Sequence, residues 1–137
     1  MTRTRRSFLH ASLAHLTANA VPLFVLTFLL FWDRDYYPRR TLALVWLASG
    51  LGTWLVGRPG TVHIGASSIV YGLAAYLVAA GIARRTWRQA LVAITVVVLY
   101  GGAIYGILPQ HGPISWEGHL SGAVAGVWFG TRKGKRQ

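Results

Sequence analysis

Five long stretches that are almost free of charged side chains constrain this chain more than any other feature. They run over residues 16–32, 41–57, 64–83, 89–108 and 115–131. Glu117, near the start of the last stretch, is their only charged residue. A helix of about 17 residues spans roughly 25 Å, slightly less than the hydrocarbon core of a bilayer. The stretches are too long and too uniformly apolar for a membrane β-barrel. We therefore predict an all-α membrane protein, a polytopic helical bundle of about five transmembrane helices.

The charged residues lie between these stretches. The 137 residues include 14 Lys and Arg against 3 Asp and Glu, and only 12% are charged, about half the fraction usual in a soluble domain. A soluble protein this basic would suggest nucleic-acid binding. Here the basic residues form short clusters between apolar stretches, as in the loops of membrane proteins, so we predict a bilayer and no nucleic acid as partner. The stretches form one domain, residues 7–131, and residues 132–137 form a basic tail.

The distribution of basic residues predicts the orientation in the membrane. Alternating spans place the loops 33–40 and 84–88 and the tail on one side, with most of the Lys and Arg residues. The positive-inside rule then puts the C-terminus in the cytoplasm. We expect a multi-pass protein of a bacterial-type plasma membrane. Five spans leave the N-terminus, with Arg3, Arg5 and Arg6, on the outer side, where basic residues are unusual.

Several polar residues lie inside the predicted spans, where each is costly and therefore a candidate for function. His15 and Asn19 are four residues apart, so they share one helix face near the outer end of the first span. Ser67 and Ser68 begin the third span, and His119 lies in the first turns of the fifth. Three helices thus bring polar groups to one depth beneath the outer surface.

Two stripes of small residues predict which helices are neighbours. The stripes are Gly122, Gly126 and Gly130 in the fifth span, and Ser68, Gly72, Ala75 and Ala79 in the third. Small residues at this spacing let two membrane helices approach closely. Contact between the stripes would bring Ser67 within reach of His119.

These groups permit nucleophilic catalysis. A serine hydroxyl becomes a nucleophile when a neutral imidazole removes its proton, and the resulting oxyanion needs hydrogen-bond donors. The side chains of His15 and Asn19, and the backbone N–H groups at the start of the third span, can donate. Glu117 is two residues from His119 and points to another helix face, so we predict a Ser–His dyad. The dyad needs no cofactor, and a zinc site of His15, His119 and Glu117 lacks any recognised spacing.

Three sequence blocks, in this order, resemble the signature of the rhomboid intramembrane serine proteases. The blocks are His10-x4-His15-x3-Asn19, then Gly65-x-Ser67 followed by Tyr71, then His119-x2-Gly122-x3-Gly126. The resemblance covers nearly the whole chain. It implies a rhomboid-like fold and a serine endopeptidase that cuts peptide bonds in or near the transmembrane segments of other proteins.

The resemblance also implies a role for each matching residue. Ser67 would be the nucleophile and His119 the general base. His15 and Asn19, with the Ser67 backbone N–H, would form the oxyanion hole, and Tyr71 would pack against the catalytic histidine. Two further roles concern glycines: Gly65 would leave room for the active-site loop, and Gly122 and Gly126 would pack the fifth span on the third. The fourth span would be the mobile helix past which substrate enters, and the site would open to the exterior.

Two departures from the family pattern bear on this interpretation. Ser68 stands where the family commonly has glycine, and the spacing from Gly65 selects Ser67 rather than Ser68 as nucleophile. The family core has six spans, whereas this chain has no counterpart of the first, so we predict a shortened form. The alternative is a catalytically inactive rhomboid-like protein that binds transmembrane segments. A small transporter would instead place its polar residues near the bilayer midplane.

Overall fold

The computed structural model of the chain describes residues 3–57, 66–109 and 116–132, with the backbone alone for residues 3–12. Within these ranges the chain forms five α-helices and two 3-10 helices, with no strand. The elements are α1 Arg3–Trp32, η1 Arg34–Tyr36, α2 Pro38–Val56, α3 Ser67–Arg84, α4 Trp87–Tyr100, η2 Gly101–Ile107 and α5 Trp116–Thr131. The predicted all-α bundle is confirmed.

Much of the outer surface of the bundle is apolar. Phe24, Trp54 and Val98 are each more than 70% exposed, among many other large apolar side chains. Three helical segments are long and apolar enough to cross a bilayer, namely Leu13–Trp32, Ser67–Arg84 and Trp87–Ile107. Hydrocarbon is the solvent that such a surface favours, and helices satisfy their own backbone hydrogen bonds within it. The chain is therefore a helical membrane protein.

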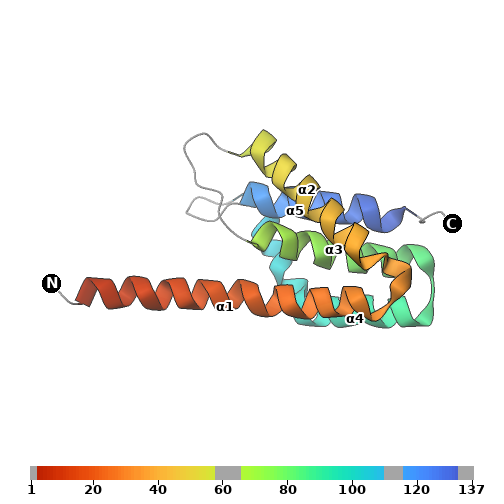
Figure 1. Cartoon of the computed structure of the whole chain (residues 1–137), viewed down its shortest axis with the longest axis horizontal. Helices are drawn as coiled ribbons and strands as arrows, with labels where there is room; N and C mark the ends of the chain where they lie inside the picture. The colour runs from red at the N-terminus through yellow and green to blue at the C-terminus, as the bar shows by residue number, and fades with distance from the viewer. Residues whose placement is uncertain (1–2, 58–65, 110–115, 133–137) are drawn as a thin grey trace.

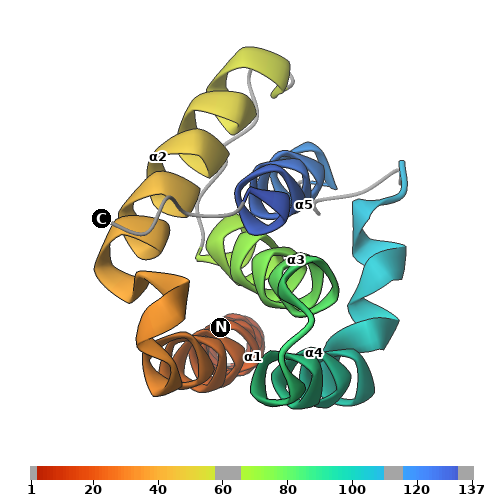
Figure 2. The same cartoon turned by 90° about the vertical axis from the view of Figure 1, so that its right-hand side faces the viewer.

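Helix α3 lies at the centre of the bundle, and the other four helices surround it (Figure 2). Its side chains Leu73, Leu77 and Ala80 are fully buried. Leu26 of α1 and Val96 of α4 belong to the same apolar cluster. Helices α3 and α5 start at the same end of the bundle and run side by side (Figure 1). The N-terminal residues of these two helices consequently lie near each other.

Glycines allow α3 and α5 to pack backbone against backbone. A Cβ atom added to Gly122 would overlap the Ser68 carbonyl, and one added to Gly126 would overlap the Gly72 carbonyl. At Gly130 the added atom would lie 2.7 Å from the Tyr76 carbonyl oxygen. The structure thus brings the two small-residue stripes together. This contact sets the register of α5 along α3.

Replacing Gly122 by alanine is expected to destabilise the protein by about 1–3 kcal/mol, because the methyl group must push α5 away from α3. Gly50 of α2 provides the matched control. A Cβ added there meets no atom within 4 Å among the described residues, and Gly50→Ala should stabilise the helix by up to about 1 kcal/mol. Thermal unfolding of both variants in the same detergent measures the difference. Equal midpoints would contradict the close α3–α5 contact.

The fourth span differs from a single straight helix. The predicted span 89–108 overlaps the candidate membrane segment Trp87–Ile107, in which the α-helix ends at Tyr100 and the chain continues as the 3-10 helix η2. Gly101 and Gly102 stand at the change. Glycine is a poor residue for an α-helix interior, and the tighter 3-10 winding often marks such a position. The change redirects the chain toward the start of α5 (Figure 1).

A polar network joins the elements at the opposite end of the bundle. The Arg84 guanidinium donates to the Asp35 carbonyl oxygen and, at 3.0 Å, to the Tyr76 hydroxyl. The Gln89 amide of α4 donates to the Asp33 carboxylate at 3.3 Å. These bonds tie the connection after α1 to the α3–α4 turn. They hold the helix ends that lie far from the N-terminus of α3 (Figure 1).

Candidate functional site

His119 lies in the first turn of α5 and is buried. Its imidazole stacks on the Tyr71 ring of α3, with centroids 4.1 Å apart and planes 10° from parallel. Its Nδ1 atom lies 2.9 Å from the Gly106 carbonyl oxygen of η2. A carbonyl oxygen only accepts hydrogen bonds, so Nδ1 carries a proton, and in the neutral imidazole Nε2 keeps its lone pair. Nε2 is thus the basic atom of this imidazole.

Ser67 is the first residue of α3. Tyr71 follows four residues later, so the two side chains lie on one face of the helix, one turn apart. The serine therefore lies one turn beyond the ring on which His119 stacks. Ser67 and His119, both within the described residues, form no hydrogen bond to each other. Catalytic hydrogen bonds in resting enzymes are often long and tighten when substrate binds.

The position of Ser67 in the helix excludes one structural role for it. A serine at the start of a helix commonly caps the free N–H groups. The N-cap position of α3 is Ala66, which makes no side-chain capping bond. Ser68, the next residue, is partly buried, and its carbonyl packs on Gly122. The hydroxyl of Ser67 is therefore not held as the N-cap of its own helix.

Gly106 was not foreseen as a residue of the site. A Cβ atom added to it would overlap the Tyr71 hydroxyl and lie 3.3 Å from Nδ1 of His119. Only a residue without a side chain lets the η2 backbone come this close to the imidazole. The available signal was a third glycine in the fourth span, four residues after Gly102. Its carbonyl orients the imidazole, as a carboxylate does in a catalytic triad.

Glu117 lies in the same turn as His119 and is 2% exposed. The Nδ1 atom of His119 bonds to Gly106 and not to this carboxylate. Gly65, a further predicted residue of the site, lies outside the described residues.

His15 and Asn19 lie on α1, where hydrogen bonds join them to each other. The Asn19 Nδ2 atom donates to the His15 carbonyl oxygen at 2.9 Å and lies 3.3 Å from His15 Nε2. The His15 side chain is exposed, and Asn19 is half-buried. The Asn19 amide nitrogen is thus directed at His15. Neither residue is hydrogen-bonded to His119.

Comparison with known proteins identifies the family. The rhomboid domain model matches residues 4–136. The chain belongs to the rhomboid family.

Two curated relatives come from mycobacteria. The uncharacterized protein Rv1337 of Mycobacterium tuberculosis is 42% identical over 127 residues, which cover 87% of this chain and 53% of that protein. The uncharacterized protein ML1171 of Mycobacterium leprae is 39% identical over 128 residues, covering 87% of this chain and 50% of the relative. The chain thus spans about half the length of the curated relatives it matches. No solved structure matches it.

Proposed function

We propose that the protein is an intramembrane serine endopeptidase, with Ser67 as nucleophile and His119 as general base. The observation that carries the proposal is the environment of His119. Tyr71 holds the ring flat at 4.1 Å, and the Gly106 carbonyl, 2.9 Å from Nδ1, leaves Nε2 as the proton acceptor. A buried histidine held in this tautomer is suited to general base catalysis. Membership of the rhomboid family, whose members are generally serine intramembrane proteases, supports the same activity.

The reaction proceeds in two stages that share one base. Nε2 of His119 takes the proton of the Ser67 hydroxyl as Oγ attacks the carbonyl carbon of the scissile peptide bond. The protonated His119 then gives this proton to the leaving amine, and an acyl-enzyme remains on Ser67. In the second stage His119 takes a proton from water, the resulting hydroxide attacks the ester, and Ser67 recovers its proton. Throughout, the Gly106 carbonyl keeps Nδ1 protonated and the ring in place.

The tetrahedral intermediate carries an oxyanion that His15, Asn19 and the Ser67 backbone N–H would stabilise. This role requires a change in α1. The Asn19 amide, which bonds to His15 in this structure, must turn toward the substrate in order to donate. Binding of substrate between α1 and α3 would cause that change. His15, which is exposed, is free to follow.

The charge distribution supports an orientation with the site toward the exterior. The described residues at the end of the bundle that carries the α1–α2 and α3–α4 connections include many arginines: Arg34, Arg39, Arg40, Arg84, Arg85, Arg88 and Arg132. By the positive-inside rule this end faces the cytoplasm. The start of α5, with His119, lies at the opposite end (Figure 1). Water from the exterior would reach such a shallow site.

The substrates are transmembrane segments of other membrane proteins. They would enter from the bilayer past α4 and η2, of which Ile104 and Tyr105 are exposed. The 3-10 winding from Gly101 makes this part of the bundle the easiest to displace, because its hydrogen bonds are weaker than those of an α-helix.

A fluorophosphonate probe on the purified protein tests the activity directly. Such probes react with activated serines, so we expect covalent labelling of Ser67, located by mass spectrometry of the digested protein. A folded, monodisperse sample that remains unlabelled and binds but does not cleave a transmembrane substrate would favour the alternative, an inactive rhomboid-like binding protein.

Tyr71 provides a second test. Tyr71→Ala removes the ring on which His119 stacks, and cleavage should fall by about one to two orders of magnitude, as expected when a catalytic group is mispositioned. Tyr71→Phe keeps the ring and should retain most of the activity. Initial rates on a transmembrane substrate in proteoliposomes measure both variants. Equal rates for the two would show that the stacked ring does not position the base.

A further inference from the structure

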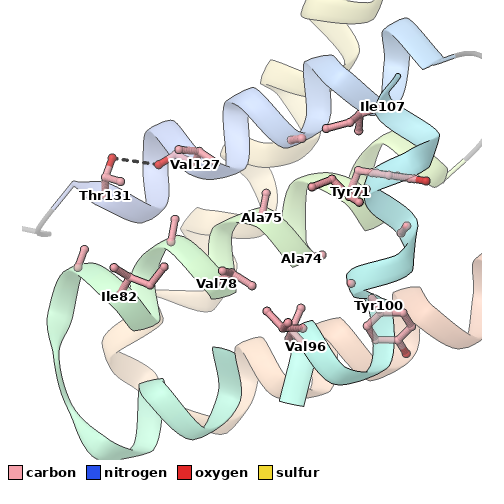
Figure 3. A pocket seen from close by; sticks show the side chains of 17 residues that line it. Tyr71, Ala74, Ala75, Val78, Ile82, Val96, Tyr100, Ile107, Val127 and Thr131 are labelled. Carbon is pink, nitrogen blue, oxygen red and sulfur yellow. Dashed lines mark hydrogen bonds between the residues drawn. The ribbon is translucent and has the colours of Figure 1, made fainter. Parts of the chain in front are cut away.

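A groove of about 500 Å³ lies between α3, α5 and the α4–η2 segment. It runs from Tyr71 and Ile107 near the proposed active site to Ile82 and Thr131 at the other end of the bundle (Figure 3). Its location is distinct from the Ser67 end of α3, where the nucleophile would act. Only the Tyr71 ring belongs to both.

The lining of the groove is almost entirely hydrocarbon. Alanines such as Ala74 and Ala75 supply small side chains, and Ile104 and Val127 supply larger ones. Tyr71, Tyr100 and Thr131 are the hydroxyl-bearing residues of the lining. The Thr131 hydroxyl donates within its own helix, at 3.0 Å to the Val127 carbonyl oxygen. A ligand in this groove therefore meets an apolar surface and must itself be a hydrocarbon.

The length and volume of the groove suit a single acyl chain. Along α3 the groove extends over the 12 residues from Tyr71 to Ile82, a rise of about 16 Å. The groove has a volume of about 500 Å³ along this length. A single extended acyl chain is slender enough to enter it.

Positive charge at one end of the groove favours a lipid with an anionic headgroup. Arg85 follows the groove residues Ile82 and Ala83 on α3, and Arg132 follows the groove residue Thr131 on α5. Both arginines are exposed. Arg84 is engaged on the other side of α3 by Tyr76 and Asp35. The Arg132 guanidinium stacks on the Trp128 ring, 4.2 Å from its centroid, and the N–H groups at its edge can still donate to an anion. Two guanidinium groups at the membrane surface attract an anionic headgroup.

We propose that this groove binds one acyl chain of an anionic phospholipid, whose phosphate is held by Arg85 and Arg132. The apolar lining takes the chain, and the arginines at the basic end of the bundle take the headgroup. A chain that fills the groove would extend to Tyr71, the residue on which His119 stacks. The inference concerns binding, and it stands whether or not the protein cleaves peptide bonds.

Native mass spectrometry of the full chain released from detergent micelles tests the proposal. Phosphatidylglycerol and phosphatidylcholine with the same two acyl chains are added in separate titrations. We expect one bound phosphatidylglycerol per chain, with affinity roughly 25-fold above that of phosphatidylcholine. This factor corresponds to about 1 kcal/mol for each arginine at the surface. Equal affinities for the two lipids would overturn the proposal.

Two pairs of variants separate the headgroup from the chain. The double variant Arg85→Ala/Arg132→Ala should lose the preference for phosphatidylglycerol. The variant Arg39→Ala/Arg40→Ala, at the start of α2 and at the same end of the bundle but away from the groove, should keep it (Figure 2). Ala103→Phe fills the groove from the exposed side of η2 and should abolish binding of both lipids. Val98→Phe is the matched control, because Val98 is 76% exposed and lies outside the lining.

The mass lost between the wild type and Ala103→Phe in native mass spectrometry identifies the molecule that occupies the groove. The lipid assignment is supported if Ala103→Phe loses one bound phospholipid and still unfolds at the same thermal midpoint as Val98→Phe. A dimer in the wild type that Ala103→Phe converts to a monomer would show that a second copy of the chain fills the groove instead. Retention of phosphatidylglycerol by Ala103→Phe, or an unchanged preference in Arg85→Ala/Arg132→Ala, would likewise contradict the assignment.

Discussion

Replacing Ser67 by alanine is expected to reduce cleavage of a transmembrane substrate by at least about a thousandfold and to abolish fluorophosphonate labelling. The change removes the Oγ atom that would form the acyl-enzyme, and catalysis collapses when the nucleophile of such a unit is lost. Stability should change by less than about 0.5 kcal/mol, because Ala66 rather than Ser67 occupies the N-cap of α3. The loss would therefore reflect chemistry and not unfolding.

Ser68→Ala is the matched control for this experiment. The two serines are adjacent, and both changes remove one hydroxyl from the first turn of α3. Labelling that survives in Ser68→Ala and disappears in Ser67→Ala assigns the nucleophile. The opposite pattern would move the reaction to Ser68. Full activity in both variants would end the case for a serine protease.

Replacing His119 by alanine is expected to have a comparable effect, a loss of at least about a thousandfold in cleavage and of probe labelling. This change removes the imidazole that is proposed to accept the Ser67 proton. The bundle should still fold, because the glycine contacts of α5 with α3 involve Gly122 and Gly126 and leave His119 out. Removal of the buried ring should cost about 1–3 kcal/mol.

Three measurements on the same preparation distinguish catalysis from structure in His119→Ala: size-exclusion profile, thermal midpoint and labelling rate. A monodisperse, folded and unlabelled variant supports the role as base. His119→Gln, which restores a polar side chain that can approach the Gly106 carbonyl, should recover stability and not activity. Loss of the folded form in both variants would show that the histidine is structural.

The contact between α3 and α5 could be predicted from the sequence. Glycines at four-residue spacing in α5 and small residues in α3 predicted that these two helices are neighbours. The structure has the carbonyls of Ser68 and Gly72 lying on Gly122 and Gly126. Such a prediction is possible because close helix approach requires small residues at fixed spacing, and spacing along a helix is a property of the chain itself.

The surroundings of His119 could be predicted only in part from the sequence. The resemblance to rhomboid proteases implied Tyr71 as the aromatic neighbour of the histidine, and the rings stack. The Gly106 carbonyl was not anticipated, because a backbone carbonyl is present at every residue and leaves no mark in the sequence. Its position depends on the change from α-helix to 3-10 helix at Gly101, which redirects the chain over the imidazole.

The sequence alone determined that the chain is a helical membrane protein, since lengths of apolar residues and clusters of charge decide how a segment meets a bilayer. Tertiary structure decided which nitrogen of His119 is free, how α4 ends, and that an apolar groove opens beside α3. These features arise where residues from separate helices meet. Their geometry depends on packing between segments far apart in the chain, and no local pattern encodes it.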